Sequence, residues 1–147
     1  MKIYPTVEEI EECLEKVCEE IYFRKTLSLV AISRGGLVPA RYIAKRLGIR
    51  RIYSLGIEFY DDDDSKMKIP YVYQRLTNTF KPEDRVLIVD DIADSGETFK
   101  IAIKEVRDAG AEKIETCTIH YKPQSAYKPT YIGKVVSDKD WIVFPWE

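Results

Sequence analysis

The chain has 147 residues, the length of a single domain over residues 1–147, and long enough to bury about 68% of the unfolded surface. Its formal net charge of −2 offers no basic surface for nucleic acid, and no apolar run approaches the roughly 20 residues of a membrane span. The three cysteines lack metal-ligand spacing, and the polar segment after Met1 is unlike a secretory signal. We therefore expect reduced thiols and a cytoplasmic protein that binds neither nucleic acid nor membranes.

The N-terminal third of the chain predicts a helix, a strand and a second helix. Thr6 and Glu9 have the spacing of a capping box, and apolar residues then recur every three or four positions. This pattern predicts an amphipathic helix over 7–22. A short apolar run at 27–33 is typical of a buried strand, and the helix after it is expected to end at Gly48.

Further strands and one more helix are expected in the remainder of the chain. The helix covers 96–110 and ends at a glycine, and a polar segment over 61–69 carries four consecutive aspartates. The strands are expected at 51–60, 70–76, 85–89, 113–121, 131–136 and 141–144. Alternation of buried strands with helices predicts an α/β fold with a mostly parallel central sheet flanked by helices.

Three of the expected strands are followed by unusual sequences. These are SRGG at 33–36, DDIADSGET at 90–98 and HYKP at 120–123. Ligands of open α/β sheets bind outside the carboxyl ends of the strands. We therefore expect all three sequences to open on the same crevice.

The second of these sequences enters a helix through a turn at 94–98. Backbone N–H groups at the start of a helix form a site for an anion, and Gly96 permits a close approach of the backbone. Ser95 and Thr98 add hydroxyl groups, so the turn suits a phosphate monoester. The alternative is an ordinary turn in which Asp94 or Ser95 caps the helix.

Two adjacent carboxylates, Asp90 and Asp91, precede this turn. Such a pair is costly at the end of a strand unless it is solvated, protonated or matched to a ligand. Carboxylates accept hydrogen bonds from two sugar hydroxyls or hold a divalent cation equally well. A phosphate beside a diol and a metal ion indicates a sugar phosphate.

The stretch 86–98 resembles the phosphoribosyl pyrophosphate (PRPP) motif of the type I phosphoribosyltransferases. It has the apolar strand, the acidic pair, two further residues, a third acid and Ser-Gly-x-Thr, without a gap. The resemblance implies that fold, with a flexible loop and a small C-terminal hood for the base. It implies that Asp90 and Asp91 hold the ribose, that Asp91 contacts Mg²⁺, and that the turn wraps the 5′-phosphate. The implied ribose and phosphate residues are Asp90, Asp91, Ile92, Ala93, Asp94, Ser95, Gly96, Glu97 and Thr98.

The SRGG sequence resembles the pyrophosphate loop of the same family. The resemblance implies that Ser33, Arg34 and Gly35 bind pyrophosphate, with a non-proline cis peptide between Ser33 and Arg34. It also implies a mobile loop between residues 60 and 69 that closes over the reaction centre and places Lys66 near the pyrophosphate. The four aspartates depart from the family pattern, and we expect a solvated loop rather than a second metal site.

HYKP and the ending DKDWIVFPWE resemble the xanthine–guanine branch of the family. The resemblance implies that Lys122 donates to the purine O6, that Trp141 stacks on the base, and that Ile142 offers backbone groups. An ammonium suits a 6-oxopurine better than the amino group of adenine. The alternative for Trp141 is an ordinary packed aromatic. For His120 we expect a packing or surface role.

The resemblance identifies the chain as a Mg²⁺-dependent phosphoribosyltransferase for xanthine, guanine or hypoxanthine, expected to be a dimer or tetramer. Asp94 corresponds to the family's acid or base near purine N7, and with Asp90 and Asp91 completes the expected catalytic set. Two other classes of protein are alternatives. A response-regulator receiver has its acidic pair in the first strand, an order that this chain lacks. A PRPP-sensing regulator of the same fold would bind nucleic acid without catalysis, and should show a basic face.

Overall fold

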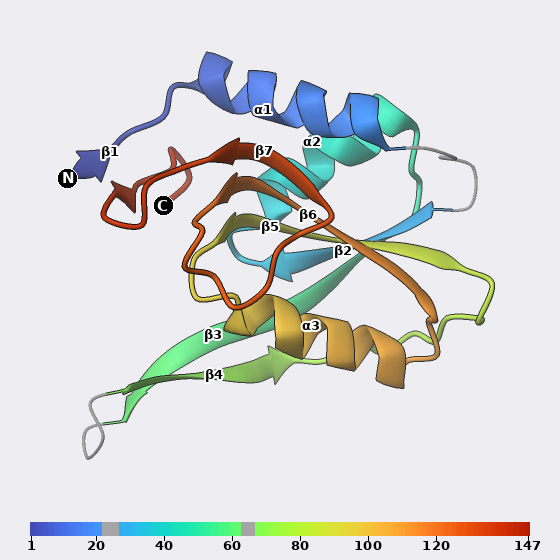
Figure 1. The fold of residues 1–147 in the computed structure, drawn as a ribbon. Helices are drawn as coiled ribbons and strands as arrows, with labels where there is room; N and C mark the ends of the chain where they lie inside the picture. The colour runs from blue at the N-terminus through green and yellow to red at the C-terminus, as the bar shows by residue number, and fades with distance from the viewer. Residues whose placement is uncertain (22–26, 63–66) are drawn as a thin grey trace.

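The computed structural model describes residues 1–21, 27–62 and 67–147, and its centre is a six-stranded sheet (Figure 1). The strand order is β4-β3-β2-β5-β6-β7. Only the β3–β4 pair within this sheet is antiparallel. The strands are β2 (Leu27–Ser33), β3 (Ile52–Asp62), β4 (Met67–Gln74), β5 (Arg85–Ala93), β6 (Lys113–Tyr121) and β7 (Tyr131–Val135). The mostly parallel sheet expected from the sequence is confirmed.

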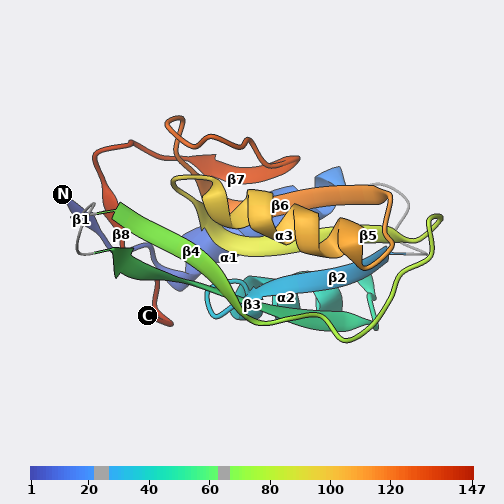
Figure 2. The same cartoon turned by 90° about the horizontal axis from the view of Figure 1, so that it is seen from below.

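Helices cover both faces of this sheet (Figures 1 and 2). Helices α1 (Val7–Glu20) and α2 (Leu37–Leu47) lie on one face, and α3 (Glu97–Asp108) lies on the other. Strand β2 is buried along its whole length because alternate residues enter two separate cores. Leu29 packs with α1 and α2, whereas Val30 packs with α3. No described helix is long and apolar enough to cross a membrane.

The helix boundaries follow from capping chemistry. The Oγ1 of Thr6 accepts a hydrogen bond from the N–H of Glu9 at 3.1 Å, which satisfies one of the free donors at the start of α1. Helix α2 ends at Gly48, whose φ of 72° is the left-handed conformation that glycine adopts most readily. Both boundaries agree with the prediction.

The three cysteines lie in the core beneath α1. Cys13 and Cys18 belong to the buried face of the helix, and Cys117 lies on β6; none of the three forms a disulfide within the described residues. A Cβ at Gly133 of β7 would lie 2.6 Å from the Cβ of Cys13, so the glycine allows α1 to sit close on the sheet. Burial raises the pKa of the Cys13 and Cys117 thiols.

A second, two-stranded sheet joins the two ends of the chain (Figure 2). Strand β1 (Lys2–Ile3) pairs in parallel with β8 (Trp141–Ile142), a pairing that the sequence did not predict. The expected strand over 141–144 is wrong in its second half. Phe144 lies outside any strand but is 1% exposed, so its apolar character reflects core packing.

The β3–β4 hairpin is longer than predicted. Asp61 and Asp62 belong to β3, and their partners Lys68 and Met67 belong to β4. The expected loop over 61–69 is therefore wrong at both of its ends, because cross-strand pairing continues through the polar residues. The other expectations for this loop, including the place of Lys66, concern residues 63–66, which lie outside the described residues.

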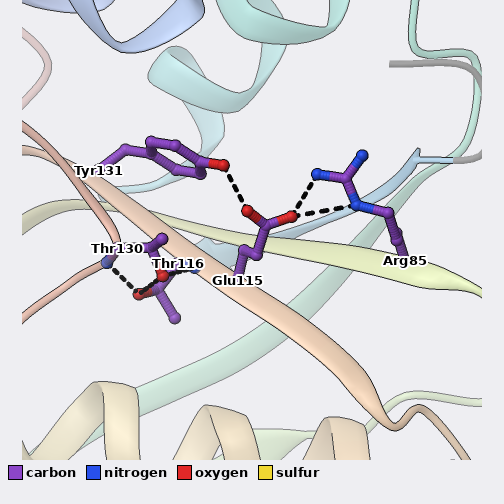
Figure 3. A network of polar contacts seen from close by, with 5 residues as sticks. All are labelled: Arg85, Glu115, Thr116, Thr130 and Tyr131. Carbon is purple, nitrogen blue, oxygen red and sulfur yellow. Dashed lines mark hydrogen bonds and ion pairs between the residues drawn. The ribbon is translucent and has the colours of Figure 1, made fainter. Parts of the chain in front are cut away.

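A polar network closes the amino-terminal edge of the sheet (Figure 3). The carboxylate of Glu115 on β6 accepts hydrogen bonds from the Arg85 guanidinium on β5 and from the Tyr131 hydroxyl on β7. Beside it, the N–H of Thr130 donates to the Thr116 hydroxyl at 2.9 Å, and the N–H of Thr116 donates to the Thr130 hydroxyl at 3.1 Å. Partners within the protein thus satisfy these groups.

Candidate functional site

A cavity of about 730 Å³ opens at the carboxyl-terminal ends of β2 and β5. Its wall combines segments far apart in the sequence: the β2–α2 turn, the end of β5, the β5–α3 turn, the β3–β4 hairpin and the C-terminus. The predicted site residues in this wall are Ser33, Arg34, Gly35, Asp90, Asp91, Ile92, Ala93, Asp94, Ser95, Gly96 and Thr98. The sequence-based expectation of a shared crevice is thus correct for two of the three strand ends.

The β2–α2 turn lies directly against the acidic pair. A Cβ at Gly35 would lie 2.4 Å from Oδ2 of Asp91, and a Cβ at Gly36 would lie 2.3 Å from the carbonyl oxygen of Val89. Only glycine fits at either position. The peptide bond between Ser33 and Arg34 is cis, as the family resemblance implied.

Strand β5 continues through the acidic pair to Ala93, four residues beyond the predicted end. Asp90 and Asp91 are 9% and 8% exposed. The N–H of Asp91 donates to Oδ1 of Asp90 at 2.9 Å. Burial and the neighbouring charge of Asp91 raise the pKa of Asp90 well above its usual value, and burial raises the pKa of Asp91. Cationic or hydroxyl-bearing ligands would relieve this unfavourable pairing of charges.

The β5–α3 turn presents the start of α3 to the cavity. Gly96, with a φ of 84°, is the N-cap of the helix, so Asp94 does not cap it; the Ser95 hydroxyl accepts from the N–H of Glu97 at 3.3 Å. A Cβ at Gly96 would lie 2.5 Å from Oγ of Ser125, which makes glycine necessary here. Of the predicted turn residues, Glu97 lies outside the cavity wall and pairs with Lys100 at 3.6 Å.

Asp94 connects the cavity to the β6–β7 segment. Its Oδ2 lies 3.3 Å from Nζ of Lys122, and its Oδ1 accepts from the side-chain amide of Gln124 at 2.6 Å. Lys122 is only 4% exposed and lies outside the cavity wall. Gln124 was not among the predicted site residues, because no motif in the sequence distinguishes it.

Two residues predicted to bind the base also lie outside the cavity wall. Trp141 is 58% exposed on β8, so it is not a packed core aromatic, and Ile142 beside it is buried. His120 is 3% exposed, its ring centroid lies 5.2 Å from that of Phe144, and its Nδ1 has no hydrogen-bond partner in the described structure. The packing role expected for His120 fits this position.

The last two residues of the chain line the cavity. The ring of Trp146 stacks on Phe144, with centroids 4.9 Å apart and an angle of 4° between the planes. Its Nε1 donates to Oδ2 of Asp91 at 3.3 Å. Glu147 lies beside it, and burial raises the pKa of its carboxyl. The ending PWE belongs to the family pattern, but no local signal places Trp146 at the acidic pair.

A divalent cation fits this site only together with a ligand. Among the described residues, no group of three or more His, Cys, Asp or Glu side chains could hold a metal ion. Asp90 and Asp91 supply carboxylates in the cavity wall, and Mg²⁺ typically binds one or two carboxylates together with substrate phosphates and water. The donor set therefore suits a metal that arrives with a phosphorylated substrate.

The cavity wall brings together an arginine turn, a carboxylate pair and a helix N-terminus, which are groups that suit a sugar phosphate at the edge of an α/β sheet. The family model described as phosphoribosyl transferase domain matches residues 2–147. The chain belongs to this family and is a transferase.

Known relatives agree with this assignment. A xanthine-guanine phosphoribosyltransferase from Gluconobacter oxydans is 32% identical over 120 residues, which are 81% of this chain and 67% of the relative. The structure of a purine phosphoribosyltransferase from Pyrococcus horikoshii superposes with a TM-score of 0.86 at 30% identity, covering 99% of this chain and 94% of the other. A Neisseria gonorrhoeae protein with bound ppGpp has a TM-score of 0.84 at 26% identity, covering 100% and 89%.

Proposed function

We propose that this protein transfers the 5-phosphoribosyl group of PRPP to a 6-oxopurine base in purine salvage. The bond between C1′ and pyrophosphate breaks, and its electron pair leaves with the pyrophosphate. A purine nitrogen forms the new bond to C1′ and releases its proton, which gives a nucleoside monophosphate. The main support is the meeting of an arginine turn, a buried carboxylate pair and a helix N-terminus in one cavity.

The residues of this cavity divide the binding of PRPP. The N–H groups at the start of α3 would bind the 5′-phosphate, and Arg34 would bind the pyrophosphate. Asp90 and Asp91 would hold the ribose hydroxyls and favour the positive charge that develops on the sugar ring. Asp91 would also hold Mg²⁺, which neutralises charge on the departing pyrophosphate when it is bound.

The pairing of Lys122 with Asp94 supports a preference for a 6-oxopurine. The 3.3 Å separation of Nζ and Oδ2 places a donor beside an acceptor. The O6 and N7 of a 6-oxopurine lie on one edge and can meet Lys122 and Asp94 together, whereas the 6-amino group of adenine would face an ammonium. Trp141 would stack on the base, and Ile142 would contribute backbone groups. The xanthine–guanine relative supports this choice.

The test is pyrophosphate release with PRPP and Mg²⁺ against guanine, hypoxanthine, xanthine, adenine, uracil and orotate. We expect turnover with at least one 6-oxopurine and none without the metal. A Lys122→Met variant should lower kcat/KM for the purine by 10- to 100-fold while PRPP binding is retained. Lys100→Met, which alters a lysine outside the cavity wall, is the matched control. An equal loss of purine and PRPP binding would contradict the role of Lys122.

The alternative is a PRPP-binding regulator of the same fold. It would bind PRPP but release no pyrophosphate with any base in the panel. The ppGpp bound to the Neisseria protein is a guanine nucleotide with pyrophosphate groups, so ppGpp is a useful competitor. For the proposed enzyme we expect ppGpp to compete with PRPP for the same cavity.

We also expect a homo-oligomer, either a dimer or a tetramer, and a cytoplasmic location.

A further inference from the structure

Tyr73 occupies a β-bulge at the mouth of the cavity. In the antiparallel ladder Ile57 pairs with Val72, and the next pair is Gly56 with Gln74. Tyr73 is therefore the extra residue on β4, with no partner of its own in the ladder. Bulges of this kind bend a strand and redirect a side chain, and they are frequent beside active sites.

The redirected ring of Tyr73 crosses Gly56. A Cβ at Gly56 would lie 2.6 Å from both Cε2 and Cζ of the tyrosine, so the ring occupies the space that a side chain on β3 would fill. Gly56 pairs with Ser33 on β2. The tyrosine thus reaches across one strand to the next, and its hydroxyl lies 2.6 Å from Oγ of Ser33.

The Tyr73–Ser33 hydroxyl pair leaves one hydroxyl proton that can be donated to a ligand. Two hydroxyl groups carry two protons, and a single hydrogen bond between them uses only one. Tyr73 and Ser33 both line the cavity, immediately beside Arg34. Tyr73 is 47% exposed, so it faces the cavity rather than the core. The position of Arg34 makes a phosphate oxygen the natural acceptor for the remaining proton.

We propose that Tyr73 is a substrate-binding residue whose hydroxyl accepts a hydrogen bond from Ser33 and donates one to the pyrophosphate group of PRPP. This inference rests on the proposed function, because it takes the ligand of the Ser33–Gly35 turn to be pyrophosphate. It adds a contact from the β3–β4 hairpin, an element to which neither the PRPP motif nor the base-recognition residues belong.

The test compares Tyr73→Phe with Tyr60→Phe in the full chain. The first variant keeps the ring over Gly56 and removes only the hydroxyl. The second changes a tyrosine of the same hairpin that is similarly exposed, at 49%, but lies outside the cavity wall. We expect Tyr73→Phe to raise the KM for PRPP and the dissociation constant of Mg²⁺-pyrophosphate about tenfold, with the purine KM changed less than twofold. Tyr60→Phe should match the wild type.

A Ser33→Ala background distinguishes direct binding from positioning. If Tyr73 contacts pyrophosphate, Tyr73→Phe must still weaken the binding of pyrophosphate when the Ser33 hydroxyl has been removed. Loss of the effect in that background, or unchanged pyrophosphate binding in the single variant, would overturn the proposal. Calorimetric binding of pyrophosphate needs no turnover. Failure of the proposed function is recognised separately, as a wild type that releases no pyrophosphate with any purine.

Discussion

Charged groups lie at both the amino-terminal and the carboxyl-terminal edge of the central sheet, but their surroundings differ. At the amino-terminal edge, the carboxylate of Glu115 has partners in both Arg85 and Tyr131 (Figure 3). At the carboxyl-terminal edge, Asp90 and Asp91 lie side by side in the cavity wall; burial and the charge of Asp91 raise the pKa of Asp90, and burial raises the pKa of Asp91. The first edge is complete without a ligand, whereas the second becomes favourable only when a ligand binds. One edge therefore serves stability and the other serves function.

The largest expected effect comes from Asp90→Asn. The amide keeps an oxygen that can accept from the N–H of Asp91 but removes a buried charge. We expect activity to fall about 100- to 1,000-fold, because the ribose loses a stabilising carboxylate. The unfolding midpoint should stay the same or rise. Activity assays and thermal unfolding measure the two effects. A variant that loses stability together with activity would contradict the contrast between the two edges of the sheet.

His120 should make the protein sensitive to acid. Burial lowers the pKa of His120 to about 4, below its usual 6.5, so the folded state favours the neutral ring. In this window the unfolded state binds more protons, and stability is lost as the pH falls from 6.5 toward 4. The loss is on the order of 3 kcal/mol. Denaturant unfolding of wild type and His120→Phe at several pH values should give curves whose difference is confined to this range.

Glu115→Ala should have the opposite effect to Asp90→Asn: it should lower stability and leave activity nearly unchanged. Removing the carboxylate leaves the guanidinium of Arg85 and the hydroxyl of Tyr131 without this acceptor at a partly buried place. We expect a loss of about 2 kcal/mol in the free energy of unfolding. The kcat should remain close to that of the wild type, because the network lies at the edge opposite the cavity. A large fall in kcat without destabilisation would contradict the view that the amino-terminal edge serves stability rather than function.

Thr130→Val should give the smallest effect. It removes the hydroxyl that accepts from the N–H of Thr116 while keeping the shape of the side chain. The expected loss is about 1 kcal/mol in urea unfolding, because the N–H of Thr116, a residue that is 0% exposed, loses a neutral acceptor. Unchanged activity is again expected; a cost above that of Glu115→Ala would reverse the proposed ranking within the network.

The parallel sheet could be predicted from the sequence because its strands are apolar on both faces. Residues 29–32 and 86–89 are continuous apolar runs, and the strands there are buried almost throughout. The β1–β8 pair could not be predicted, since two residues carry no periodicity. The long β3–β4 hairpin was missed because its end is polar, and pairing there depends on the backbone rather than on side-chain burial.

The site was predictable only where a local motif exists. The turn at 33–36 and the segment 90–98 are continuous in sequence and lie together at one edge. Trp146 and Tyr73 reach the cavity from elements distant in the chain. Their places depend on a stacked ring in the first case and on a bulge in the second. Neither feature leaves a pattern within a short window of sequence.

The buried cysteines allow local opening of this protein to be measured from the rates at which their thiols are labelled. Thiols react with soluble reagents as thiolates, and Cys13, Cys18 and Cys117 lie in the core beneath α1. Modification in the native state must therefore wait for a fluctuation that admits the reagent. Cys13 and Cys18 lie on α1, and Cys117 lies on β6 in the same core, so lifting of α1 from the sheet would expose all three thiols. Labelling of these thiols faster than global unfolding would show that α1 separates from the sheet while the rest of the molecule stays folded.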